Sequence, residues 1–518
     1  MREEVSRYRR RCELKVDNIL LALSPLIVSI ILTTFTYVSL TTLWLAFGVW
    51  SSMVVGAFVF MNYAMVYRRS RVYTPEIVGE LPKLKVASFV TSFNEDPNIV
   101  KSTLVSVKLA TDGLGKVFLL DDSTNPEIRK ELEKFCRENG IEYFHRDNRR
   151  GFKGGAINDA LKKVGDEFDL VAIFDADQRP VEDFFKQVLP YFKDPKVVMV
   201  QIPQEYSETY SKISRGARYQ QEPFLRVIMP GRSGTSAFSL GSGSVFRVSA
   251  LKEVGYFAEF SITEDAATSI LLHERGYRTV YADASLIWYG EPPEDLPSYL
   301  TQQSRWSFGY FQLFGRLLRS NLGLSVFFDY YSGFLYWLKE GPVTLMEFVA
   351  PMVFLILRVP IVKINPFLYA MLYFPYLLVT IALFSFSVRG KGEYGMKGFF
   401  YHQVVEYLSF VAITGSFISW LMRRKIPFKV TPKGVRRNSR NLRLIWMHIL
   451  VTLLLVISAI LGMLWFLQAS SANLRYAIAI NVFWALYQVP FLLGGILFAL
   501  SPIEEGREYV RVDAERSG

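Results

Sequence analysis

Three pairs of closely spaced acidic residues have types and spacing that could do chemistry. They are Asp121 with Asp122, Asp175 with Asp177, and, after Thr263, Glu264 with Asp265. Two neighbouring carboxylates repel each other unless a cation joins them. Mg²⁺ and Mn²⁺ take carboxylate oxygens together with phosphate oxygens, so Asp175 and Asp177 predict a metal site for a phosphorylated ligand. The alternative is an acidic surface turn, because short D-x-D sequences are common.

The segment from Thr263 to Trp306 contains groups for proton transfer and for charge stabilisation. Asp265 has the chemistry of a general base that takes a proton from an attacking hydroxyl, although an acid in the first turn of a helix also has a structural use. Arg305 is suited to stabilise the negative charge that develops on a departing diphosphate. Trp306 offers a flat face for a sugar ring, or an aromatic anchor at a membrane surface.

Another cation lies on a glycine-rich turn. Lys153 occurs in the sequence Arg-Arg-Gly-Phe-Lys-Gly-Gly of residues 149–155, directly before a segment with helical spacing. The N-terminal end of a helix attracts phosphate, so this turn suits a diphosphate. A flexible basic surface loop is the alternative. No Walker-type G-x-x-x-x-G-K-[ST] sequence is present, which argues against an ATPase.

Short apolar strands position these groups. Strands are predicted at residues 85–90, 116–120, 170–174 and 197–200, with helical patterns between them. This alternation predicts an α/β domain with an open, mostly parallel sheet, whose ligands bind at the carboxyl ends of the strands. The first three strands are followed by Asn94 with Glu95, Asp121 with Asp122, and Asp175. Asp121 and Asp122 have acceptors for a base or a ribose.

Long apolar segments flank this domain on both sides. We predict six membrane spans, at residues 18–38, 43–66, 343–362, 367–388, 444–467 and 477–500. Basic residues stand at both outer ends of the first pair, so the positive-inside rule places the intervening domain in the cytoplasm. The expected organisation is a basic segment with two spans at 1–71, the α/β domain at 72–310, interfacial helices at 311–342, four spans within 343–500, and a short tail at 501–518.

The segment 398–422 is apolar enough to span, but the charge of the following loop argues against it. Residues 423–443 carry nine cations and no acid. A span at 398–422 would place this loop outside, against the positive-inside rule. We therefore predict a helix along the cytoplasmic face, with a spanning helix as the alternative.

Composition narrows the classes of function and of site. The formal charge is +11, and its cations cluster beside apolar runs, which favours an anionic cytoplasmic leaflet over nucleic acid. The two cysteines, Cys12 and Cys136, predict neither a disulfide framework nor a zinc site. Polar groups also occur inside predicted spans, where they usually face a wet path: Glu347, Arg358, Asn481 and Gln488. Snorkelling from the ends of a span is the alternative for Glu347 and Arg358.

These motifs, taken in order along residues 85–434, resemble the processive family 2 glycosyltransferases of the cellulose synthase and hyaluronan synthase type. The resemblance rests on Asn94-Glu95, Asp121-Asp122, Lys153, Asp175-Ala176-Asp177, Gly241-Ser242, Thr263-Glu264-Asp265, Gln302-x-x-Arg305-Trp306, and a loop from Phe428 to Gly434 similar to the gating loop of cellulose synthases.

The resemblance implies a GT-A-type domain inserted in a multi-pass membrane domain of the cell membrane, and a role for each matching residue. Asp265 would be the base of an inverting reaction, with Thr263 and Glu264 in the same motif. The nucleotide sugar would contact Asn94, Glu95, Asp121, Asp122, Lys153, Asp175, Asp177 and Arg305, with Asp175 and Asp177 on Mg²⁺ or Mn²⁺. The acceptor would contact Gln302, Trp306, Gly241 and Ser242. The gating loop would act through Phe428, Val430, Thr431 and Lys433.

The implied activity is polymerisation of a β-linked polysaccharide from a UDP-sugar of the UDP-glucose or UDP-GlcNAc type, with export through the spans. The partners would be the UDP-sugar, the growing glycan, the bilayer and accessory export subunits. Only residues 501–518 follow the last predicted span, so we expect no PilZ-type domain. Leu240 stands where cellulose synthases usually have cysteine. Transfer of a single sugar to a lipid carrier is the alternative reaction, and a transporter or scaffold with an inactive domain is the alternative class.

Overall fold

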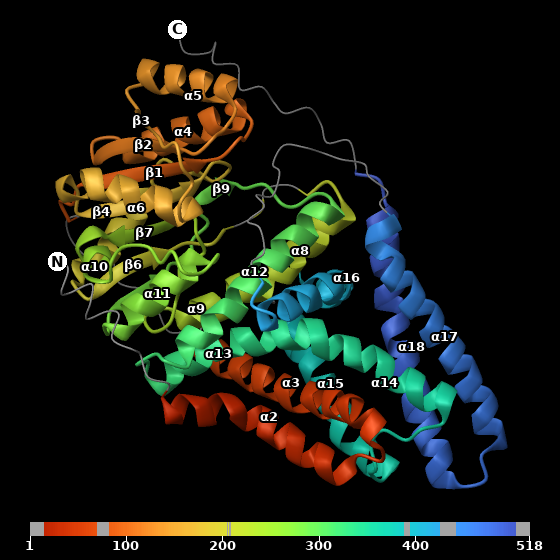
Figure 1. Ribbon diagram of the computed structural model, residues 1–518. Helices are drawn as coiled ribbons and strands as arrows, with labels where there is room; N and C mark the ends of the chain where they lie inside the picture. The colour runs from red at the N-terminus through yellow and green to blue at the C-terminus, as the bar shows by residue number, and fades with distance from the viewer. Residues whose placement is uncertain are drawn as a thin grey trace.

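The structure is a computed structural model that describes residues 15–69, 82–204, 206, 209–387, 394–424 and 442–503. An α/β domain occupies one end of the molecule and a set of long helices the other (Figure 1). The predicted gating residues Phe428, Val430, Thr431 and Lys433 lie outside the described residues, as do residues 1–14 and the tail from 504.

Seven strands form the main sheet, in the order β3-β2-β1-β4-β7-β6-β8. They are β1 (Val86–Ser92), β2 (Gly115–Asp121), β3 (Glu142–His145), β4 (Leu170–Asp175), β6 (Val197–Gln201), β7 (Ser244–Arg247) and β8 (Arg278–Tyr281). Every neighbouring pair is parallel except those of β7, which runs antiparallel to β4 and to β6. The predicted mostly parallel sheet is confirmed. A small ribbon pairs β5 (Arg179–Pro180) with β9 (Ile287–Tyr289).

Helices cover both faces of the sheet because successive strand residues point to opposite sides. In β1, Val86 and Val90 enter one apolar core, whereas Ala87 and Phe89 enter the other. The first core includes residues of α4 (Pro97–Thr111), α5 (Pro126–Glu138) and α7 (Phe184–Val188). The second includes residues of α6 (Phe152–Val164), α10 (Val248–Glu253) and α11 (Glu264–Glu274).

Local signals explain where several of these helices begin. Asp96 caps α4 by accepting a hydrogen bond from the backbone of Asn98, and Asn125 caps α5 in the same way. Each cap precedes a proline, which is favoured at the first helical position because its missing N–H has no partner there anyway. The remaining short elements are η2 (Gly165–Glu167), η3 (Leu189–Lys193), α8 (Lys212–Pro223), η4 (Phe224–Ile228) and α9 (Met229–Arg232).

Long apolar helices make up the other half of the molecule. They are α2 (Val16–Thr36), α3 (Leu43–Arg69) after the short η1 (Leu40–Thr42), α13 (Leu324–Leu338), α14 (Thr344–Leu357), α15 (Pro366–Ser387), α16 (Gly395–Leu421), α17 (Leu442–Gln468) and α18 (Ala472–Leu500). Within the described residues, seven helices are long and apolar enough to cross a membrane. One of these seven is α16, which we predicted to lie along the membrane surface and not to span. The six-span topology therefore stays a prediction.

The join between the two halves differs from the predicted boundaries. Residue 310 falls inside a single helix, α12 (Leu296–Leu317), which begins at an Asp295 cap and packs against both α13 and α16. Interfacial helices within 311–342 and a separate span from 343 were expected. Instead α13 continues through a π-helical turn, η5 (Lys339–Val343), into α14. Pro342 lies within this turn, where its missing N–H interrupts the regular helical ladder.

Candidate active site

A cavity of ≈ 180 Å³ lies at the carboxyl ends of β1 and β4, where the parallel-sheet rule predicts a ligand site. Most of the predicted residues line it. They are Glu95, Asp122, Lys153, Asp175, Gly241, Thr263, Glu264, Asp265, Arg305 and Trp306. Residues up to 211 positions apart in the sequence, from Glu95 after β1 to Trp306 on α12, therefore meet in one site.

Lys153 is one of three cations that line this cavity, with Arg149 and Arg305. It lies in the first turn of α6, after Gly151, whose φ of +67° is a left-handed conformation that favours glycine. Its ammonium donates to the carbonyl of Gly241 over 2.8 Å and to the carboxylate of Asp175. The backbone N–H of Asp175 in turn donates to Ser242 Oγ over 2.9 Å. Lys153 thereby joins the end of β4 to the loop before β7.

Glu264 and Asp265 lie in the first turn of α11, where the backbone amides stabilise negative charge. Asp265 Oδ1 accepts a 2.8 Å hydrogen bond from the N–H of Ala266. Burial raises the pKa of Glu264 to about 7, with a further contribution from Asp265 and opposition from Lys153 and Arg305. Burial also raises the pKa of Asp265, and the hydrogen bond to Ala266 and the charge of Lys153 oppose it. A carboxylate with a raised pKa is a stronger base.

Three glycines allow these elements to approach one another closely. A methyl group on Gly309 of α12 would lie 2.3 Å from Thr263 Cγ2, and one on Gly154 of α6 would lie 3.1 Å from Glu264 Cγ. Gly241 has a φ of +90°, and its Cβ would lie 3.1 Å from Asp265 Oδ2 and 3.6 Å from Lys153 Nζ. The predicted acceptor residue Gly241 thus faces the proposed base directly.

Helix α12 presents Gln302, Arg305 and Trp306 on one side, since residues three and four apart share a helix face. Burial lowers the pKa of Arg305, while Glu264, Asp175 and Asp265 oppose the shift through their negative charge. Arg305 and Trp306 line the cavity, whereas Gln302 lies one turn away and donates to the hydroxyl of Tyr206 over 3.3 Å.

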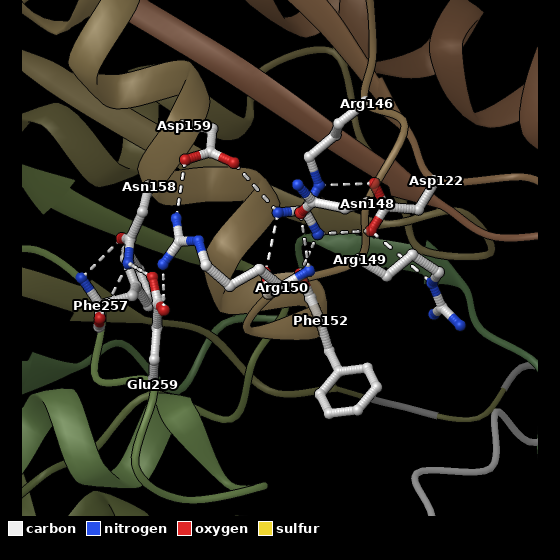
Figure 2. A network of polar contacts seen from close by, with 10 residues as sticks. All are labelled: Asp122, Arg146, Asn148, Arg149, Arg150, Phe152, Asn158, Asp159, Phe257 and Glu259. Atoms are coloured by element: carbon white, nitrogen blue, oxygen red, sulfur yellow. Dashed lines mark hydrogen bonds and ion pairs between the residues drawn. The ribbon is translucent and has the colours of Figure 1, made fainter.

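Asp122 is held in an ion pair that sequence reasoning missed. Arg146 donates to both of its oxygens, Nε to Oδ1 over 2.8 Å and Nη2 to Oδ2 over 2.7 Å. The remaining donors of Arg146 reach Asp159 and the carbonyls of Arg150 and Phe152. Figure 2 shows this network fastening the end of β2 to the glycine turn before Lys153. The carboxylate of Asp122 therefore positions that turn.

The same network continues to the segment before the Thr263 motif. Arg150 pairs with Asp159 over 2.9 Å and with Glu259 (Figure 2). Asn158 donates to Glu259 Oε1 over 2.9 Å and to the carbonyl of Phe257 over 3.0 Å. The chain that leads into α11 is thus fixed to α6, which carries Lys153.

Asn94 and Asp121, both predicted to contact the nucleotide, do not line the cavity but brace the loops around it. Asn94 has a φ of +51° and accepts hydrogen bonds from the backbone of Thr124 and Asn125. Asp121 is 1% exposed and accepts from Tyr143 Oη over 2.8 Å. Asx side chains commonly hold turns in this way.

Arg149 lines the cavity and was missed as a site residue. Its guanidinium lies 3.3 Å from the ring centroid of Phe93, and its Nε is buried with no hydrogen-bond partner in the described part of the chain. Burial lowers its pKa, although Asp122 opposes the shift. The signal was present in the run of three cations over residues 149–153, which sequence reasoning attributed to Lys153 alone.

The two predicted metal ligands, Asp175 and Asp177, would hold a cation only together with oxygen atoms from water or from a bound phosphate. Among the residues described, no group of three His, Cys, Asp or Glu side chains gathers for a metal. Asp177 is 2% exposed, and its Oδ2 accepts from the N–H of Glu291 over 3.1 Å. Mg²⁺ and Mn²⁺ commonly bind one or two carboxylates and take their other ligands from water and phosphate. Asp175 lines the cavity and Asp177 does not, so the assignment of both residues to a metal stays a prediction.

A second cavity, of ≈ 310 Å³, lies among the long helices. Three of the four polar residues singled out within predicted spans line it: Glu347, Asn481 and Gln488. Arg358 does not. It ends α14 in a left-handed conformation, with its guanidinium 5.3 Å from the ring centroid of Trp465. The prediction that Arg358 faces the same path as Glu347 is therefore wrong.

Polar contacts connect α12 to this second cavity. Tyr299, one turn before Gln302, donates to Gln220 Oε1 over 2.9 Å, and the amide of Gln220 lies 3.4 Å from the hydroxyl of Tyr336. Tyr336 donates to Glu406 over 2.7 Å. Tyr336 and Glu406 both line the second cavity. The helix that bears Arg305 and Trp306 is thus joined to the membrane half by hydrogen bonds.

Comparison with known proteins agrees with this geometry. Residues 170–384 match the model of the Glycosyl transferase family group 2. The chain is 27% identical over 483 residues to the UDP-forming cellulose synthase catalytic subunit of Pseudomonas fluorescens, covering 90% of this chain and 62% of that protein. It is 28% identical over 427 residues to cellulose synthase 2 of Novacetimonas hansenii, covering 79% and 26%. The chain therefore spans less than two thirds of the length of these relatives.

Two further similarities extend beyond cellulose synthases. A probable glucomannan 4-beta-mannosyltransferase of Oryza sativa is 32% identical over 212 residues, which cover 39% of this chain and 38% of that one. A mannosyltransferase of Pyrobaculum calidifontis, solved with GDP-Man and Mn²⁺, has a TM-score of 0.51 at 14% identity, covering 72% of this chain and 99% of that one. The latter shows the shared fold. The chain is therefore similar in sequence to cellulose synthases and related family 2 glycosyltransferases, and it shares the fold of the Pyrobaculum mannosyltransferase.

Proposed function

We propose that the protein polymerises a β-linked glycan from a UDP-sugar on the cytoplasmic side of a membrane and passes the chain outward through its long helices. The observation that carries this proposal is the meeting of Asp265, Lys153 and Arg305 in one cavity, on elements that continue into the membrane half. The UDP-forming activity named for its Pseudomonas relative supports the choice of UDP.

Asp265 is the general base in this proposal. A hydroxyl of the acceptor sugar attacks the anomeric carbon of the donor, the bond from that carbon to the diphosphate oxygen breaks, and Asp265 takes the hydroxyl proton. Attack from the face opposite the diphosphate inverts the anomeric centre, so an α-linked donor yields a β-linked product. Trp306 lines the cavity beside Asp265, where its ring offers a stacking face for the acceptor.

Positive charge for the leaving diphosphate comes from side chains around the same cavity. Lys153, Arg305 and Arg149 all line it, and their charges become more favourable as the diphosphate gains charge in the transition state. Asp175 and Asp177 would hold a divalent cation, which supplies further charge to the phosphate oxygens when bound. The fold relative solved with Mn²⁺ supports a divalent ion without choosing between Mn²⁺ and Mg²⁺.

The second cavity is the proposed path of the product. It is lined by polar groups and by aromatic rings, among them Tyr369, Tyr373 and Trp484. Aromatic faces stack on the apolar faces of sugar rings, whereas polar groups exchange hydrogen bonds with hydroxyls. The hydrogen bonds from Tyr299 to Glu406 support a continuous polar route from α12 to this cavity.

Product size decides between this proposal and its alternatives. The purified full chain in detergent is incubated with a panel of UDP-sugars and GDP-mannose, with Mn²⁺ or Mg²⁺, and the products are sized. Long glycans from a UDP-sugar, lost in Asp265→Asn, are the expected result. Only single-sugar lipid products would replace polymerisation by lipid glycosylation, and no turnover with any donor would favour a transporter or scaffold.

A further inference from the structure

The second cavity contains more acid than base, and its bases are already paired. Glu340, Glu347 and Glu406 line it, together with one lysine and one histidine. Lys339 Nζ lies 2.9 Å from Glu347 Oε2, and His402 Nε2 lies 2.8 Å from Glu406 Oε1. Each base is thus held against a carboxylate, and the third acid, Glu340, has no hydrogen bond or ion pair to another residue in the described ranges.

Glu406 is tied further into the cavity wall. Its carboxylate accepts from Tyr336 Oη over 2.7 Å and from Gln403 Nε2 over 2.5 Å, in addition to its contact with His402. Tyr394 Oη lies 2.7 Å from the other ring nitrogen of His402. Both nitrogens of the imidazole are therefore occupied, and the ring has no donor left for a ligand.

A hydrogen-bond acceptor without a partner points independently to the chemistry of the ligand. Gln488 lines the cavity and is 4% exposed, and its Oε1 is buried with no partner in the described part of the chain. A buried acceptor left unpaired is unfavourable, so a ligand that brings a donor is favoured there. Sugar hydroxyls and ammonium groups are donors, whereas a carboxylate adds acceptors only.

From these groups we propose that the membrane cavity selects the exported chain by charge: it accepts a β-linked glycan whose sugars bear hydroxyl or amino groups and rejects one that bears carboxylates. The cavity offers a uronate no unpaired cation, because Lys339 and His402 already lie against Glu347 and Glu406, and the remaining ionisable group is a further acid, Glu340, in a poorly solvated site. Glu340 and Gln488 hold the donors of the accepted chain. This inference rests on the proposed export of a glycan, but its test does not need catalysis.

Three tetrasaccharides on one backbone provide the test. They are β-1,4-linked tetramers of glucose, of glucosamine and of glucuronate, which differ in charge and share their linkage. Binding to the detergent-purified full chain is measured by isothermal titration calorimetry at fixed salt. We expect the neutral and cationic tetramers to bind and the anionic one to bind at least about tenfold more weakly.

Substitutions localise the discrimination to the cavity. Glu340→Gln removes the carboxyl group but keeps the size and polarity of the side chain. It should bring the affinity for the anionic tetramer closer to the affinity for the neutral one. Glu347→Gln should do so more strongly because it also frees Lys339. Gln488→Leu should weaken binding of the neutral tetramer. Glu253→Gln, at an exposed position of α10, is the matched control and should leave all three affinities unchanged.

Two results would overturn the inference: equal binding of the glucuronate and glucose tetramers, or a discrimination that Glu340→Gln and Glu347→Gln leave unchanged. Absence of binding for all three tetramers would also overturn it. Turnover of nucleotide sugars is measured in parallel. A charge preference in a protein without turnover keeps the cavity inference and removes the proposed polymerase, whereas turnover with no charge preference does the reverse.

Discussion

Replacing Lys153 by methionine removes one cation of the active site while keeping a side chain of similar length. In the structure Lys153 holds the carboxylate of Asp175 and the carbonyl of Gly241. The Cβ position of Gly241 is 3.1 Å from Asp265 Oδ2 and 3.6 Å from Lys153 Nζ. The proposed base and the ammonium are therefore at most about 7 Å apart.

The magnitude follows from that separation. Two unit charges 7 Å apart at an effective dielectric of about 20 interact by roughly 2 kcal/mol, which corresponds to a factor of about 30 to 50. Lys153→Met removes this attraction from the ionised form of Asp265, so the pKa of Asp265 rises further. It also removes a charge that would stabilise the departing diphosphate. We expect kcat/KM for the UDP-sugar to fall by about 10²-fold or more.

The assay is UDP release by the purified protein at saturating Mn²⁺ from pH 5 to 9. Because the base must be ionised, activity falls as pH drops through its pKa, and the acid limb of the variant should lie about one to two pH units above that of the wild type. Lys153→Arg keeps the positive charge and should lose less activity than Lys153→Met. Lys162→Met, at an exposed position on the same helix, is the matched control. Turnover within twofold of the wild type with an unchanged acid limb would refute the assignment of Lys153.

Three further predictions concern the surroundings of this cation. Glu264→Gln should raise the apparent Tm above pH 7 and change it little near pH 4. Burial raises the pKa of the wild-type carboxyl from 4.5 to about 7, so ionising that group in the folded protein costs stability as pH rises through this window. Equal Tm shifts at both pH values would contradict this. Gly309→Ala should reduce kcat by about tenfold or more because its methyl group displaces Thr263, whereas Gly315→Ala on the same helix meets only Arg319 Nη1 at 3.4 Å and should be nearly silent. Asp177→Asn should raise the Mn²⁺ concentration for half-maximal UDP release by about tenfold, and an unchanged titration would exclude Asp177 as a ligand.

Sequence patterns predicted the sheet and the convergence of its acidic residues well. Parallel strands are short, apolar and separated by helices, so four of them were located within two residues of their observed ends. The rule that ligands bind at the carboxyl ends then brought Asp175 to the site. Strands β3 and β7 were not predicted, because each is only four residues long and includes polar or charged residues.

Sequence reasoning distinguished contact residues from bracing residues less well. Tyr143 donates a hydrogen bond to the carboxylate of Asp121, and Arg146 donates to that of Asp122. These partners are some 20 positions away in the sequence and become neighbours only when β3 pairs with β2. Hydropathy likewise could not show that α13 and α14 form one interrupted helix, since Lys339 and Glu340 at the π-helical turn resemble a break between two segments. Both differences arise from tertiary contacts that local patterns do not encode.

Helix α12 has a practical consequence for how this protein can be studied. It carries Arg305 and Trp306 into the catalytic cavity, yet its neighbours include α13 and α16 of the apolar half. A soluble fragment that ends before Leu296 would lack these residues, and one that ends after Leu317 would leave the faces buried against α13 and α16 exposed to water. We therefore expect that the α/β domain alone is not obtained as a water-soluble protein with a complete cavity, and that inhibitor screens and crystallisation need the whole chain in detergent or lipid.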